Sequence, residues 1–190
     1  MNAAFSQPSF RFPRRLGLRG AVTVSFDGAA LTLRGAEGGE RRIAPAQVAR
    51  LRSGRDDAGK YGPSYETRLW LSDGGGKLAF AVLGTGNAGG YLATMRGFAA
   101  AMAADGRLAR MEGGTSVAGS LLFPGLVGAL FLAASCVALF VLTNQPWWGR
   151  LLVPLLPGVM TALGIVAARR SWPRPVASLE EYGFRLEGRR

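Results

Sequence analysis

Two long apolar runs constrain the fold of this chain more than any other feature. They cover residues 117–143 and 151–168, and neither contains a Lys, Arg, Asp or Glu. A helix needs about 20 residues to cross the roughly 30 Å hydrocarbon core of a bilayer. We therefore predict two transmembrane helices, which form a hairpin over residues 116–168.

The connection between the two runs is typical of a tight loop at a membrane surface. It reads Asn-Gln-Pro-Trp-Trp-Gly-Arg over residues 144–150, and aromatic residues are enriched at lipid–water boundaries. Basic residues flank the outer ends of the two runs, which predicts that both termini are cytoplasmic in a two-span protein of the bacterial inner membrane. The predicted interface residues are Trp147, Trp148, Arg150, Arg169, Arg170 and Trp172.

The net charge of +11 is concentrated outside the apolar runs. A predicted cytoplasmic domain over residues 1–115 carries 16 basic and 9 acidic side chains, and a predicted basic tail over residues 169–190 carries 6 and 3. Such an excess fits a surface for nucleic acid or anionic lipid, or the ordinary basic flanks of membrane helices. With two spans present, we favour the flanks and lipid and predict no nucleic-acid partner.

Composition argues against the common enzyme classes. There is no histidine, and the single cysteine, Cys136, lies within the first apolar run. These two facts exclude an internal disulfide, a thiolate metal site and every Ser–His or Cys–His catalytic arrangement. We expect a non-enzymatic protein with no metal and no cofactor. The first residues contain no apolar core of a signal peptide, so we expect the first apolar run to direct insertion.

Alternating apolar residues predict an antiparallel β-structure of about seven short strands before the apolar runs. Strands are expected near residues 9–12, 21–26, 30–34, 40–43, 47–52, 66–71 and 77–83. Residues 53–64 are polar and predict a long loop. Tyr91, Leu92, Met95, Phe98 and Met102 then recur at helical spacing, which predicts an amphipathic helix that ends before Gly106.

This order of elements resembles a pleckstrin-homology (PH)-like domain, and the whole chain resembles bacterial membrane proteins that carry such a domain beside two membrane helices. The resemblance covers residues 10–104. It rests on the strand–turn–strand run that leads to Ile43, Pro45 and Val48, and on a last hairpin that runs directly into the helix. The implied fold is α+β: an antiparallel barrel or sandwich capped by a C-terminal helix, with a transmembrane hairpin added.

Gly84-Thr85-Gly86-Asn87-Ala88-Gly89 matches the glycine pattern of dinucleotide-binding loops. That function also requires a strand after the helix with an acidic residue about 20 positions on. Because we expect the membrane segment there instead, we interpret this stretch as a simple connection.

A cluster of arginines early in the chain is the candidate binding site for anionic lipid or a partner. Its members are Arg11, Arg14, Arg15 and Arg19. Each basic side chain near an anionic membrane contributes about 1 kcal/mol of attraction. In PH-family proteins that bind phosphoinositides, basic residues near the first strands hold the head group, but the spaced signature of those proteins is missing here.

Small residues within the apolar runs favour close packing of the two predicted helices, or association with helices of another protein. They are Gly125, Gly128, Ala129, Gly158 and Ala162. After the runs, Ser178-Leu179-Glu180-Glu181 predicts a capping box and a short helix.

Together these features predict a membrane-anchored adaptor or scaffold that recruits or stabilises a protein partner at the membrane. Two alternatives stay open. One is an accessory structural subunit that contacts a larger complex through its membrane helices, and the other is an anionic-lipid-binding module. The sequence does not indicate the oligomeric state.

Overall fold

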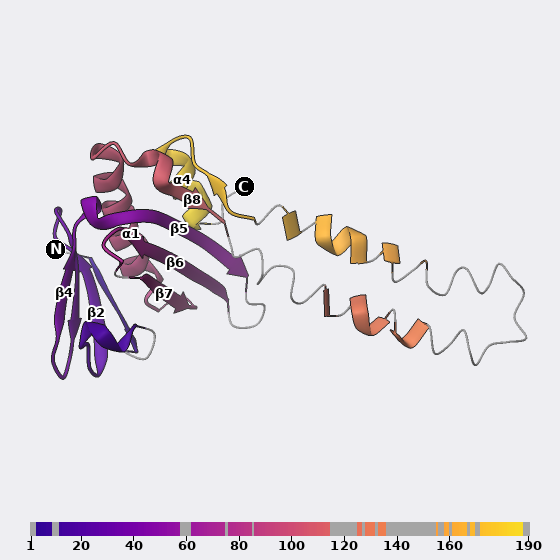
Figure 1. Ribbon diagram of the computed structural model, residues 1–190, viewed down its shortest axis with the longest axis horizontal. Coiled ribbons are helices and arrows are strands. Elements are labelled where there is room, and N and C mark those ends of the chain that lie inside the picture. Colours follow the sequence, from indigo (N-terminus) through magenta and orange to yellow (C-terminus); the bar gives the residue numbers. More distant parts are fainter. Residues whose placement is uncertain are drawn as a thin grey trace, which may run out of the picture. The chain divides into compact units, whose positions relative to one another are not determined.

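The chain divides into two compact units in a computed structural model (Figure 1). Unit 1 comprises residues 1–114 and 173–190, and unit 2 comprises residues 115–172. The structure describes the residues in the following ranges: 3–8, 12–57, 62–74, 76–84, 86–114, 125–126, 128–131, 133–135, 155, 158–159, 161–166, 168–169 and 172–187.

The first sheet of unit 1 is an antiparallel meander of four strands. They are β1 (Ala4–Pro8), β2 (Ala21–Phe26), β3 (Leu31–Gly35) and β4 (Glu40–Ile43), in the order β1-β2-β3-β4. Alternate side chains are buried, as expected for a sheet with one face on a core. The buried set includes Phe5, Val22, Val24, Leu31, Leu33 and Ile43.

The second sheet has five strands in the order β7-β6-β5-β8-β9. Three of these strands are β5 (Val48–Asp57), β6 (Pro63–Leu71) and β7 (Lys77–Leu83). The pairings β5–β6 and β6–β7 are both antiparallel. The short strand β8 (Met111–Gly113) pairs parallel to β5, and β9 (Arg174–Pro175) pairs antiparallel to β8.

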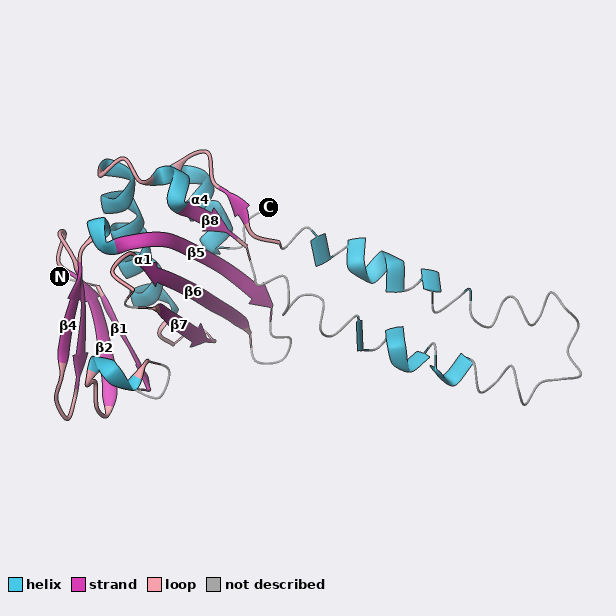
Figure 2. Cartoon of the chain, viewed as in Figure 1, coloured by secondary structure: helices cyan, strands magenta, loops and turns pink. Residues whose placement is uncertain are grey.

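Helix α1 (Ala88–Ala104) completes the core of unit 1 together with the two sheets. Tyr91 meets Phe5 with ring centroids 5.1 Å apart, and Phe98 meets Phe26 at 5.9 Å, both edge-to-face. The predicted apolar stripe is thus confirmed, with Tyr91, Met95, Phe98 and Met102 fully buried. Figure 2 shows the helices of unit 1 and the two sheets.

A buried glutamine joins the two sheets where β1 and β7 meet. Gln7 is only 4% exposed. Its amide nitrogen donates to the Ala79 carbonyl oxygen at 3.4 Å, and its amide oxygen accepts from the Ala81 amide nitrogen at 3.1 Å. The side chain therefore satisfies backbone groups at the edge of β7 that would otherwise be buried without partners.

The last residues of the chain return to unit 1. After β9, helix α4 (Leu179–Glu187) buries Tyr182 and Leu186 completely. The first half of the predicted capping box is present, because the Glu181 amide donates to the Ser178 hydroxyl at 3.0 Å. The Glu181 carboxylate accepts from the Ala177 amide at 2.7 Å, one residue before the N-cap. The sequence predicted a separate tail over residues 169–190. Residues 173–190 instead complete the folded unit, because Val176, Tyr182 and Leu186 join its core.

The predicted α+β class is confirmed, but several details of the prediction were wrong. The described strands form two open sheets rather than a closed barrel. Strand β1 (Ala4–Pro8) precedes the strand predicted near residues 9–12, of which residues 9–11 lie outside the described residues. Strand β5 continues to Asp57 through a stretch predicted as loop. A strand, β8, does follow α1. Strands β6 and β5 separate β8 from β7, so β8 lies roughly 14 Å from the strand that precedes the glycine-rich connection.

Unit 2 contains helical residues in both predicted spans, but much of each span lies outside the described residues. Within the described part of the chain, no helix combines the length and the apolar character needed to cross a bilayer. Among the described residues of unit 2, seven large apolar side chains are exposed: Leu126, Leu130, Phe131, Leu155, Val159, Leu163 and Val166.

The docking of α4 yields a stability prediction. Leu186 is fully buried, whereas Leu179 on the same helix is 39% exposed. Leu186→Ala should lower the free energy of unfolding by about 2–5 kcal/mol, because it leaves a cavity, and the matched Leu179→Ala by less than about 1 kcal/mol. Chemical denaturation of the detergent-solubilised chain, followed by near-ultraviolet circular dichroism, measures both. Equal effects would contradict the docking of α4.

Candidate functional site: a cationic sheet face and a helix groove

The predicted arginine cluster is exposed where it is described. Arg14 and Arg15 lie in a short 3-10 helix, residues 14–16, and Arg19 follows in the same connection between β1 and β2. The Arg15 guanidinium donates to the Gly74 carbonyl oxygen at 3.5 Å, so this loop reaches the turn between β6 and β7. Arg11 lies outside the described residues.

Two of the predicted interface residues are described, and they contact each other. The Arg169 guanidinium lies 5.6 Å from the ring centroid of Trp172, which is cation–π geometry. The other four, Trp147, Trp148, Arg150 and Arg170, lie outside the described residues.

One of the predicted packing glycines in unit 2 is at a close helix contact. Gly128 is buried, and a Cβ atom at this position would overlap the Thr161 side chain. Gly125, Ala129, Gly158 and Ala162 are exposed. The structure thus pairs Gly128 with Thr161, a residue that the sequence analysis did not single out.

The outer face of the second sheet carries a cluster that sequence reasoning missed. Three cations surround the indole of Trp70: Arg50 at 4.9 Å, Arg52 at 5.3 Å and Lys77 at 6.0 Å from the ring centroid. We call Arg50, Arg52, Trp70 and Lys77 the Trp70 face. Arg50 pairs with Trp70 across β5 and β6, and Trp70 pairs with Lys77 across β6 and β7, so three adjacent strands build the cluster.

Carboxylates balance only part of the charge on this face. The Arg50 guanidinium binds the Glu112 carboxylate of β8 at 2.7 Å, and the neighbouring Arg68 pairs with Glu66. No carboxylate among the described residues lies within ion-pair distance of Arg52. Partial burial, followed by repulsion from Arg68, lowers the pKa of Arg52 below its ordinary value, although the group stays charged at neutral pH.

The sequence contains the alternating pattern that produces this face, but the pattern can be recognised only when the pairing of the strands is known. Arg50 and Arg52 alternate with buried Leu51 and Ser53, and Trp70 alternates with Leu69 and Leu71. Period-two alternation places each set on the outer face of its own strand. Only the pairing of Arg50 with Trp70 brings the two sets together.

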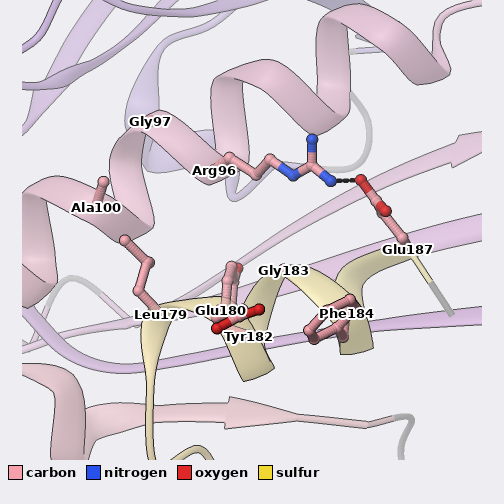
Figure 3. A pocket seen from close by; sticks show the side chains of 9 residues that line it. All are labelled: Arg96, Gly97, Ala100, Leu179, Glu180, Tyr182, Gly183, Phe184 and Glu187. Carbon is pink, nitrogen blue, oxygen red and sulfur yellow. Dashed lines mark ion pairs between the residues drawn. The ribbon is translucent and has the colours of Figure 1, made fainter. Parts of the chain in front are cut away.

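A groove of about 640 Å³ lies between α1 and α4. Figure 3 shows Gly97 and Ala100 of α1 on one side and Leu179, Tyr182 and Phe184 of α4 on the other. Phe184 is 45% exposed, and an ion pair between Arg96 and Glu187 bridges the two helices. The groove offers apolar contact area with one charged pair at its side.

A buried chain of four hydroxyl groups joins the two helices to the sheet. The Ser53 hydroxyl lies 2.6 Å from both the Tyr182 and the Thr67 hydroxyls, and Thr67 lies 2.5 Å from the Tyr91 hydroxyl. All four side chains are essentially inaccessible to solvent. Burial raises the pKa of both tyrosines well above the ordinary value of 10. These groups stay protonated, so the chain acts as a structural connection.

The described surfaces of unit 1 offer groups that are suited to binding. Among the described residues, no group of three metal-ligating side chains is positioned to hold an ion. The Trp70 face offers cations and an aromatic surface, and the α1–α4 groove offers apolar area. No protein-family model, curated protein or solved structure shows significant similarity to this chain.

The buried tyrosines yield a pH prediction. The folded state favours the neutral phenols of Tyr91 and Tyr182, so their contribution to stability is complete below pH 10 and decreases as the pH rises above it. In an alkaline titration monitored by phenolate absorbance, two of the four tyrosines should ionise only when the protein unfolds. If both ionised reversibly near pH 10 in the folded protein, the buried hydroxyl chain would be wrong.

Proposed function

We propose that the chain is a membrane-anchored, non-enzymatic adaptor or scaffold of the bacterial inner membrane. Unit 1 recruits or stabilises a protein partner, and unit 2 is the anchor. The observation that carries this proposal is the surface of unit 2, where the described residues include seven exposed large Leu, Phe and Val side chains. Exposed apolar area of this kind needs lipid or protein to cover it.

The pairing of β8 with β9 supports a hairpin anchor. Gly113 pairs with Arg174, so the residues on either side of the 115–172 insertion are hydrogen-bonded neighbours. An insertion that starts and ends at one place crosses a bilayer an even number of times, which agrees with two spans. Both chain termini belong to unit 1 and therefore lie on one side of the membrane, the cytoplasmic side by the distribution of basic residues.

The order of elements in unit 1 supports the PH-like part of the proposal. A four-stranded sheet precedes the three-stranded group β5–β7, and α1 follows directly and fills the core. The strand β8, the strand β9 and the helix α4 are additions to this plan. A PH-like domain of this kind functions through its surfaces, which suits recruitment.

Each alternative has one observation in its favour. The exposed apolar side chains of unit 2 suit an accessory subunit that packs against other membrane helices. Exposed Arg14, Arg15 and Arg19 suit attraction to anionic lipid. In all three cases the partners are membrane lipids and a protein in or at the membrane.

Membrane fractionation tests the anchor. The full chain should stay in the membrane pellet after alkaline carbonate extraction, because apolar helices hold it in lipid. A variant in which a short Gly-Ser turn replaces residues 115–172 should be soluble and should retain the unfolding transition of unit 1, since the turn still lets β8 pair with β9. Release of the full chain by carbonate would refute the anchor, as would retention of the shortened variant in the pellet.

A further inference from the structure

We propose that the Trp70 face binds an acidic, extended segment of a protein partner. This inference rests on the recruiting role proposed above and names the chemistry of the recruited protein. The face is available because both helices contact the opposite side of the sheet. The inward side chains of β5 and β6 include Ser53 and Thr67, which belong to the hydroxyl chain with Tyr91 of α1 and Tyr182 of α4.

The protein already shows which ligand this face accepts. Glu112 approaches from β8 and places its carboxylate 2.7 Å from the Arg50 guanidinium, which also lies over the Trp70 ring. A guanidinium stacked on an aromatic ring keeps its N–H groups free to donate at its edge. Arg52 has the same relation to Trp70, and no carboxylate in the described part of the chain lies within ion-pair distance of it, so Arg52 is the open position of the face.

The separation of the cations allows contact with alternate side chains of an extended peptide. The charged groups of Arg52 and Lys77 both lie close to the Trp70 centroid and are therefore within about 11 Å of each other. Side chains two residues apart in a strand point the same way and are about 7 Å apart. A Glu-x-Glu or Asp-x-Asp segment can thus present one carboxylate to Arg52 and the next to Lys77, with its backbone across the indole.

The charge around the face favours a peptide over a bilayer or a nucleic acid. Glu112 binds Arg50 and Glu66 binds Arg68, so both carboxylates lie beside the face and repel a continuous polyanion or a densely anionic surface. A segment with a few carboxylates is repelled much less.

The test uses the full chain in detergent micelles and a fluorescein-labelled peptide of about eight residues with alternating Glu and Ser. The peptide should bind, with affinity that falls at about 0.5 M salt, and a Gln-Ser peptide should not. Arg52→Gln and Trp70→Leu should each weaken binding about fivefold or more. Arg34→Gln is the control, because Arg34 carries the same charge, is exposed and pairs with Glu40 on the first sheet. It should change the affinity for the Glu-Ser peptide less than about twofold.

Several outcomes would overturn the proposal. They are equal binding of the Glu and Gln peptides, equal losses in the Arg52 and Arg34 variants, and an Arg52→Gln effect confined to anionic vesicles or oligonucleotides. Unfolding curves check each variant, and Arg52→Gln provides the test if Trp70→Leu alters the fold. The Arg52→Gln variant should stay in the membrane pellet after alkaline carbonate extraction. Loss of peptide binding is therefore distinguishable from loss of the membrane anchor.

Discussion

The pairing of β8 with β9 is the constraint on which the rest of the architecture depends. It joins Glu112 to Pro175 and Gly113 to Arg174, and so closes residues 115–172 into an insertion within one folded unit. Two-residue strands contribute little stability alone. The pairing persists because the helix α4, which follows β9, buries Tyr182 and Leu186. The Arg185 guanidinium of α4 also donates to the Gly113 carbonyl oxygen of β8 at 3.3 Å.

The hydroxyl chain connects this closure to the rest of the core. Tyr182 is hydrogen-bonded to Ser53 of β5, and the chain continues through Thr67 to Tyr91 of α1. Buried hydroxyls of this kind are costly unless paired, so they specify one position for each helix. The α1–α4 groove and the Trp70 face both depend on that arrangement, since the groove lies between the two helices and the face lies on the other side of β5 and β6.

The sequence predicted what local patterns encode. Alternation located most strands, Leu92 and its neighbours located α1, and Ser178 with Glu181 located the start of α4. It could not predict contacts between distant segments. Arg174-Pro175 has no strand signal, so its pairing with β8 was invisible, and the polar residues 53–57 appeared to be loop although they pair with β6. The Trp70 face was missed because its residues come from three different strands. The sequence of one strand does not determine which of its residues pair with those of its neighbours.

Crosslinking across β8 and β9 in native membranes tests the central claim most directly. Glu112→Cys and Pro175→Cys, in a Cys136→Ala background, place two thiols on directly paired positions, which is suitable geometry for a disulfide. A protease site added within residues 144–150 then separates the chain into two fragments. After mild oxidation we predict that the fragments stay joined until a reductant is added. Fragments that separate without reductant would contradict the closure of the insertion within unit 1.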